Sequence, residues 1–97
     1  MAYKVSLLEE AAEEVIKTAR FYKEIDEKLA NDLLEKFFET ITYISKNPFT
    51  NQVIRNNFRK SNLKRFPYKV IYRLKENEII IVAFAHHKQK PHYWKKR

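Results

Sequence analysis

The fold is decided by residues 68–87, which read YKVIYRLKENEIIIVAFAHH. Large apolar side chains occupy every second position from Tyr68 to Leu74, which predicts a strand with one wet face. Ile79 to Ala85 is apolar at every position, which is typical of a central strand covered on both sides. The residues between them, Lys75–Glu78, predict a tight hairpin, with Asn77 in the left-handed conformation that glycine usually supplies.

Two helices are predicted before these strands. The first begins at Ser6-Leu7-Leu8-Glu9, which has the spacing of a capping box. The second begins at Asp26 and ends at Asn47-Pro48, because the residue before proline is pushed out of helical geometry. Only a few residues near Ile25–Glu27 join the helices, so we expect an antiparallel hairpin. The apolar stripes expected to face the core are Leu8, Ala12, Val15, Ala19 and Tyr22 in the first helix, and Ala30, Leu33, Leu34, Phe37, Phe38, Ile41 and Ile44 in the second.

The remaining segments complete a small mixed fold. Tyr3–Leu7 alternates well enough for a first strand, and Phe58–Phe66 predicts a weak strand after the polar loop Phe49–Asn57. A basic tail, His92–Arg97, follows the last strand. The order is therefore β-α-α-β-β-β in a single α+β domain, residues 1–97, with the helix hairpin packed on an antiparallel sheet.

The composition excludes several classes of function. The chain has no Gly, so it contains neither a P-loop nor a dinucleotide-binding fingerprint. It has no Cys, which removes disulfides, thiolate nucleophiles and cysteine-based zinc sites. The longest apolar run, Ile79–Ala85, is far shorter than the roughly 20 residues of a membrane-spanning helix. We expect a cytoplasmic protein that needs no cofactor and contacts no membrane.

Charge is distributed very unevenly along the chain. The formal net charge is +8, yet residues 1–46 hold 7 basic and 10 acidic side chains, whereas residues 47–97 hold 13 basic and 2 acidic ones. The acidic residues near the start of the first helix, where the helix dipole favours anions, are expected to form a solvated face; they are Glu9, Glu10, Glu13 and Glu14. Such asymmetry usually separates a scaffold from a working surface.

The basic half offers a candidate binding surface for a polyanion or an acidic protein segment. Its cations lie on or beside the later strands and in the tail, and they are Lys60, Lys64, Arg65, Lys69, Arg73, Lys88, Lys90, Lys95, Lys96 and Arg97. Such a patch holds phosphates with salt-dependent affinity, and Tyr93 and Trp94 beside it would stack on bases. The alternative interpretation is a solvated face without a partner.

His86 and His87 lie where the central strand ends. Adjacent strand residues point to opposite faces, so at most one of them faces the basic surface. A histidine there would act as general base or acid for a 2′-hydroxyl that attacks its own phosphodiester, with Lys and Arg stabilising the transition state. A histidine at a strand end also often only caps a carbonyl group. The spacing of His86, His87 and His92 does not match known zinc sites, so no metal is predicted.

Two stretches of this sequence resemble a known family. LKRFPYKVIYR at residues 63–73 and HHKQKP at residues 86–91 are similar to the RelE/ParE superfamily, the toxins of bacterial type II toxin–antitoxin (plasmid stabilisation) modules. The β-α-α-β-β-β order agrees with that resemblance along the whole chain. It implies a growth-inhibiting toxin and a cognate antitoxin, whose C-terminal segment, commonly acidic, wraps the toxin in a hetero-oligomer.

The resemblance implies two alternative targets. RelE-type members cut mRNA in the ribosomal A site, whereas ParE-type members act on DNA gyrase. Along the RelE pattern, Lys60 matches a catalytic Lys, Asn62 replaces a second Lys, and Lys69 and Lys88 stand where Arg is expected. Lysine lacks the planar fork with which arginine binds phosphate. The terminal Tyr of that pattern is matched by Trp94, or by Tyr93 with a one-residue slip.

The Phe66-Pro67-Tyr68 run and the turn at residues 86–91 look closer to ParE, so the resemblance favours a ParE-like toxin, with a RelE-like mRNA interferase as the alternative. If the chain is an interferase, its catalytic residues are expected among His86, His87, Lys60, Arg65, Lys69 and Tyr93. For any of these targets, the other cations and Trp94 are expected to bind the nucleic acid or the partner. A third alternative is a non-toxic basic binding module whose partner protein is its only function.

Overall fold

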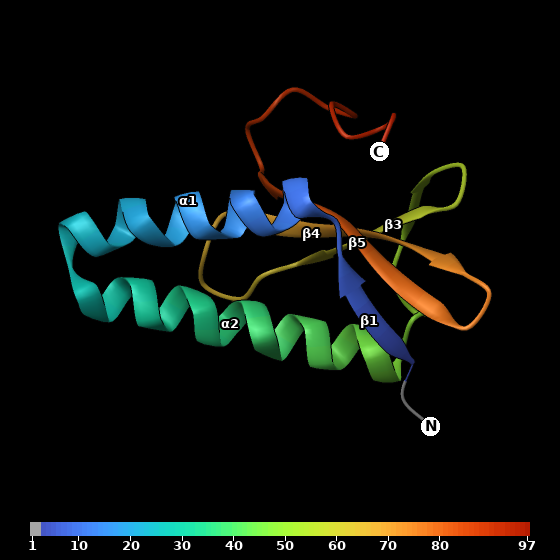
Figure 1. The fold of residues 1–97 in the computed structure, drawn as a ribbon, viewed down its shortest axis with the longest axis horizontal. Coiled ribbons are helices and arrows are strands. Elements are labelled where there is room, and N and C mark those ends of the chain that lie inside the picture. Colours follow the sequence, from blue (N-terminus) through green and yellow to red (C-terminus); the bar gives the residue numbers. More distant parts are fainter. Residues whose placement is uncertain (1–2) are drawn as a thin grey trace.

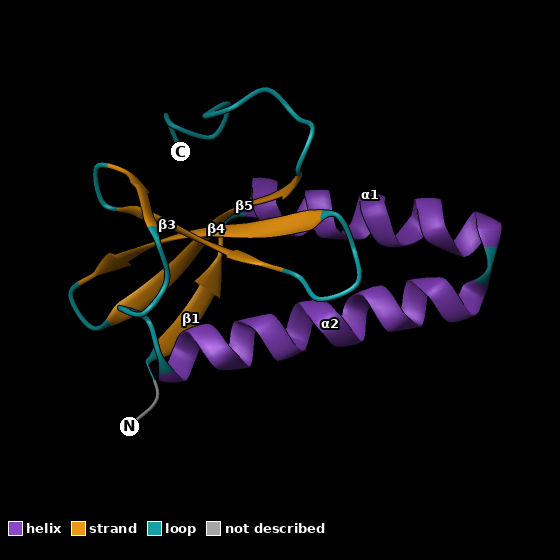
Figure 2. Cartoon of the chain, turned by 180° about the vertical axis from the view of Figure 1, so that it is seen from behind, coloured by secondary structure: helices purple, strands orange, loops and turns teal. Residues whose placement is uncertain are grey.

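A five-stranded sheet and a helix hairpin form the structure, a computed structural model that describes residues 3–97 (Figures 1 and 2). The strands lie in the order β1-β5-β4-β3-β2. In chain order the elements are β1 (Lys4–Leu7), α1 (Glu9–Ile25), α2 (Glu27–Lys46), β2 (Val53–Arg55), β3 (Phe58–Asn62), β4 (Tyr68–Lys75) and β5 (Glu78–His86). The predicted α+β class and the helix hairpin are confirmed. Among residues 3–97, no helix has the length and apolar character needed to cross a membrane.

The sheet differs from the prediction in two respects. A short strand, β2, lies inside the segment predicted to be a polar loop, and it pairs antiparallel with β3. β1 pairs with β5 in parallel, with Val5 opposite Ile79, so the sheet is mixed rather than antiparallel. Strand periodicity is the same for both orientations, so the alternation of apolar residues carries no information about direction.

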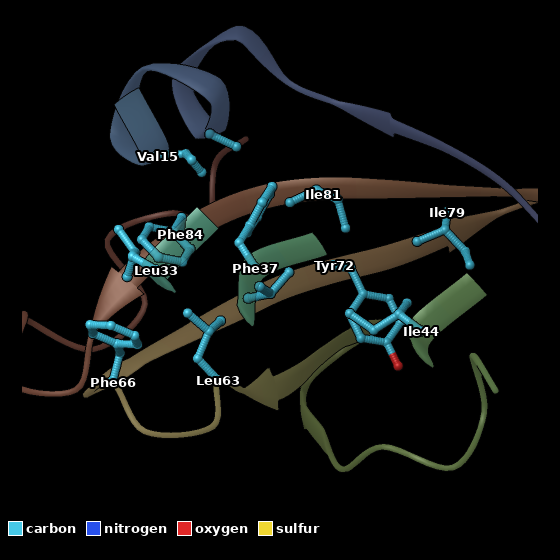
Figure 3. Packing of buried hydrophobic residues seen from close by; sticks show 12 residues of the cluster. Val15, Leu33, Phe37, Ile44, Leu63, Phe66, Tyr72, Ile79, Ile81 and Phe84 are labelled. Atoms are coloured by element: carbon cyan, nitrogen blue, oxygen red, sulfur yellow. The ribbon is translucent and has the colours of Figure 1, made fainter. Parts of the chain in front are cut away.

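The main core lies between the sheet and the helices. Leu33, Phe37 and Ile44 on α2 and Val15 on α1 are buried against side chains of β4 and β5 (Figure 3). Phe37 packs edge-to-face on Phe84, with ring centroids 5.5 Å apart. The predicted stripe of α1 is displaced in part, because Ala11 is fully buried whereas Ala12 is not.

Tyr72 connects this core to the loop after α2. Its side chain is fully buried, and its hydroxyl donates to the Pro48 carbonyl at 2.8 Å and accepts from Asn51 Nδ2 at 3.0 Å. Burial raises the pKa of this phenol. The buried hydroxyl therefore has two hydrogen-bond partners, both in the loop that follows α2.

The second face of the sheet, opposite the helices, is covered by the segment that follows β5. Trp94 is only 2% exposed and packs with Ile71, Val82 and Ala83, and its ring lies 4.8 Å from that of Phe58. In Figure 1 this segment arches over the N-terminal half of α1 and ends near the sheet. The prediction that the last strand is covered on both sides is therefore confirmed.

The two predicted helix starts have different outcomes. Asp26 caps α2 as expected, because its Oδ1 accepts from the Lys28 amide at 3.0 Å. The prediction of a capping box at Ser6 is wrong. Ser6 lies in β1 opposite Ile80, and Leu8 precedes α1 without a side-chain cap while its amide donates to the Ile81 carbonyl at 3.0 Å. Pairing with β5 extends the strand beyond the position at which a helix would otherwise start.

The glycine-free turns place other residues in the left-handed region. Positive φ angles occur at Asn56 (49°), Arg65 (73°), Glu76 (56°) and His92 (63°). The prediction that Asn77 makes the β4–β5 turn in this conformation is wrong, since the neighbouring Glu76 does so. The left-handed region costs a residue with a Cβ about 1–2 kcal/mol, and asparagine tolerates it best.

Glycine substitutions in this hairpin should therefore have opposite effects on stability. Glu76→Gly removes the steric cost of the left-handed conformation. Part of this gain is offset because glycine raises the conformational entropy of the unfolded chain, so the free energy of unfolding should rise by about 0.5 kcal/mol. Asn77→Gly is the matched control. It only raises the conformational entropy of the unfolded chain, so it should lower the free energy of unfolding by about 0.5 kcal/mol. Urea unfolding of both variants measures the difference, and a destabilised Glu76→Gly would contradict the assignment of strain.

Candidate functional site

Three basic side chains gather where β3, β4 and β5 meet on the second face of the sheet. Lys60 pairs with Ile71 across β3–β4, and Lys69 pairs with Asn62, so both lysines share a face with the buried Ile71. His87 follows β5, and its amide donates to the Pro67 carbonyl at 3.0 Å. We call Lys60, Lys69 and His87 the cationic cluster. Arg73 shares their face, on the far side of Ile71 along β4.

The cationic cluster changes the acid–base behaviour of His87. Burial lowers the pKa of this imidazole below 6.5, and the charges of Lys69, His86 and Lys60 lower it further. The ring is therefore neutral near pH 7 and available to accept a proton or a hydrogen bond. A bound anion would favour its protonated form, which adds a third positive charge to the cluster.

His86 occupies a different environment. Its ring lies edge-on against Tyr68, with centroids 5.1 Å apart, and its Nδ1 accepts from the Lys88 amide at 3.0 Å. Its own amide donates to Gln89 Oε1 at 2.8 Å. Tyr68 lies on the helix side of the sheet, where burial and Tyr22 raise its pKa to about 12. His86 therefore shapes the turn after β5, and only His87 belongs to the cationic cluster.

Two predicted members of the basic surface point toward α2 instead. Arg65 forms an ion pair with Asp32, with Nη1 and Oδ2 2.8 Å apart, so its side chain lies toward α2 rather than beside Lys60 and Lys69. Lys64 borders a hollow between α2 and β3 together with Thr40 and Ser61. The left-handed conformation of Arg65 and the turn that follows β3 direct these side chains away from the sheet face.

Glu14 is a residue whose environment the sequence did not predict. It was predicted to lie on a solvated face, but its carboxylate accepts from the Phe84 amide at 3.0 Å, Tyr93 Oη at 2.7 Å and Arg97 Nη1 at 2.9 Å. The Glu14 and Arg97 side chains are each only 20% exposed. The one available signal was its position directly before the buried Val15, at the border of the apolar stripe.

This contact also changes the interpretation of the predicted basic tail. Trp94 is buried, so the prediction that its ring stacks on bases is wrong for this conformation. Burial and the hydrogen bond to Glu14 raise the pKa of Tyr93 well above its usual value. The cations that remain exposed after β5 are Lys88, Lys90, Lys95 and Lys96.

Histidines and carboxylates do not assemble into a metal site in the part of the chain that the structure describes. Among residues 3–97, no three such side chains converge as metal ligands would. His92 packs its ring 5.3 Å from that of Trp94. The chemistry available at the cationic cluster is therefore that of lysine ammonium groups and one neutral imidazole.

Comparison with known proteins places the chain in a family. Residues 5–91 match the model of the ParE toxin of the type II toxin–antitoxin system parDE. The chain belongs to the ParE toxin family. It is thus a toxin component of a type II toxin–antitoxin system, as its resemblance to the RelE/ParE superfamily implied. No curated protein matches the sequence significantly.

Solved structures share the fold of this ParE-family toxin at low sequence identity. The chromosomal ParDE system of P. aeruginosa has a TM-score of 0.77 at 16% identity, covering 88% of this chain and 96% of that one. The RelBE2 toxin–antitoxin complex of Mycobacterium tuberculosis has a TM-score of 0.59 at 16% identity, covering 89% and 99%. A mutant of the E. coli toxin RelE in the free state has a TM-score of 0.57 at 20% identity, covering 91% and 86%.

The geometry predicts how His87 titrates. Its NMR pKa should lie below 6.5, and Lys69→Ala should raise it, because one of the neighbouring positive charges is removed. The unfolded chain then takes up a proton at higher pH than the folded chain, so stability falls as pH drops below 6.5. Lys90→Ala, which removes an exposed cation from the same loop, is the control. An unchanged pKa in Lys69→Ala would contradict the proximity of the two groups.

Proposed function

We propose that this protein is a ParE-like growth inhibitor that acts on DNA gyrase in the cytoplasm. Family membership supports the ParE side of the superfamily. The observation that supports this choice of target is the hydrogen bond of the Tyr93 hydroxyl to Glu14, together with the surface ion pair of Arg65 with Asp32. Both residues are among the catalytic candidates for mRNA cleavage, and both are bound by carboxylates of the helices.

The state of Tyr93 argues against a role in proton transfer. Its hydroxyl donates to a carboxylate only 2.7 Å away, and burial together with Glu14 raises its pKa. A general acid works best with a pKa near the working pH, and this phenol is shifted away from it. Arg65 pairs with Asp32 of α2, so its guanidinium is directed toward that helix rather than toward Lys60 and Lys69.

The cognate antitoxin is proposed to mask the cationic surface. The basic half of the chain carries 13 cations against 2 acidic residues, and the cationic cluster faces away from the acidic helices. An acidic antitoxin segment is the complementary partner for such a surface.

Lys60→Glu together with Lys69→Glu should therefore weaken antitoxin binding more than Lys4→Glu with Lys17→Glu, a matched change at exposed helix and edge-strand positions.

Induced expression in cells with and without the antitoxin tests the target. The proposal expects growth arrest without the antitoxin, accumulation of gyrase–DNA cleavage complexes and intact mRNA. Codon-spaced cuts in ribosome-bound mRNA without cleavage complexes would exclude gyrase as the target. A complete lack of growth arrest would leave the basic binding module as the function.

The cationic cluster favours an mRNA interferase as the second candidate. His87 is positioned to accept the proton of a 2′-hydroxyl as the O2′–P bond forms and the P–O5′ bond breaks. Lys60 and Lys69 would stabilise the added negative charge, and solvent would protonate the leaving oxygen.

A single substitution separates the two candidates. His87→Ala should lower mRNA cleavage by roughly 100-fold if the chain is an interferase, since general base catalysis is lost. It should leave growth arrest nearly unchanged if gyrase is the target. His86→Ala is the neighbouring control, because its ring packs on Tyr68 outside the cluster. Equal cleavage by both variants and the wild type would remove histidine from the mechanism.

A further inference from the structure

We propose that Glu14 is a positioning residue for toxicity, because its carboxylate holds residues 92–97 in the conformation that the toxin's target binds. The proposal rests on the toxin function and names a residue of α1 that no motif of the family stretches contains. The segment it holds is remote in sequence, since Tyr93 and Arg97 lie 79 and 83 residues further along the chain.

One carboxylate satisfies three donors at this point. Oε1 of Glu14 accepts from the Phe84 amide and from Arg97, and Oε2 accepts from Tyr93. Arg97 Nη1 also donates to the Val82 carbonyl at 3.0 Å. Charge-assisted hydrogen bonds of this kind are stronger than neutral ones, and low exposure of both side chains reduces screening by solvent. α1, β5 and the final segment therefore meet at a single side chain.

The final segment has few other means of staying in place. It forms no strand or helix, and its backbone closes only local turns, from Lys95 to His92 at 3.0 Å and from Arg97 to Trp94 at 2.9 Å. His92 adopts a left-handed conformation with φ of 63°. The attachment of this segment to the sheet depends on burial of Trp94, on the contacts with Glu14 and on the hydrogen bond from Arg97 to the Val82 carbonyl.

The ordered segment presents a defined surface to a partner. Arg97 is neutralised by Glu14, which leaves Lys95 and Lys96 as the exposed cations of a fixed turn. A partner that binds a pre-ordered segment does not have to order it at the moment of binding. Release from Glu14 should therefore weaken target binding without removing any residue that touches the target.

The single tryptophan of the chain makes the proposal measurable. Trp94 is buried, so its fluorescence emission should shift to longer wavelength when the segment detaches. Glu14→Ala should show this shift and a loss of potency of about tenfold or more, measured as the amount of toxin that arrests growth. Glu13→Ala, which removes the same charge from an exposed neighbouring position, should match the wild type in both measurements.

Substitutions in the segment itself separate positioning from general destabilisation. Arg97→Ala should reproduce the effect of Glu14→Ala, whereas Arg97→Lys, which can still pair with Glu14, should restore most of the potency. Far-UV circular dichroism should be the same for all variants. These variants leave α1 intact, so they keep the test valid if Glu14→Ala fails to fold.

Two outcomes would overturn the inference. In one, Trp94 becomes exposed in Glu14→Ala but growth arrest is unchanged. In the other, Glu14→Ala leaves the emission of Trp94 unchanged. Growth arrest is measured independently of the target, and inhibition of gyrase supercoiling by the purified toxin is measured in parallel. A wild type that arrests growth without inhibiting gyrase would contradict the proposed target and leave the role of Glu14 standing.

Discussion

The structure depends on the burial of β5 on both faces. Ile79, Ile81 and Phe84 point into the helix-side core, while Val82 and Ala83 contribute to a second cluster on the opposite face. A strand of this kind is stable only if each face has its own cover. The helix hairpin covers one face of β5. The short segment after β5 covers the other face. Folding this segment back is thus part of forming the sheet.

The same constraint determines where the basic residues lie. Every second residue of β4 is committed to the helix-side core, so its cations stand at the positions between, on the second face. Ile71 is covered there by Trp94, and Lys69 and Arg73 remain beyond the covered region on either side. The surface available to a partner is what the returning segment leaves open. The strand pattern that builds the core therefore also defines the candidate site.

Features with a local cause were predictable from the sequence. The period of apolar residues defined both helices and the long strands, and Asp26 caps α2 because the cap is a contact between near neighbours. Features that depend on distant partners were not. β2 pairs with β3 through only a few residues, and Glu14 meets groups 70 or more positions away. The sequence around a carboxylate next to an apolar stripe is the same whether or not the fold brings a distant hydrogen-bond donor to it.

The number of basic residues in the second half of the chain is larger than the number that remain unpaired at its surface. Arg65 and Arg97 are neutralised by Asp32 and Glu14 of the acidic half, and Arg59 donates to backbone carbonyls of the loop after α2. Within residues 3–97, no lysine of the basic half forms an ion pair. The guanidinium groups of Arg65 and Arg97 thus join the two halves, and the exposed basic surface consists mainly of ammonium groups. Such a surface selects a partner by its charge density more than by the geometry of a single phosphate.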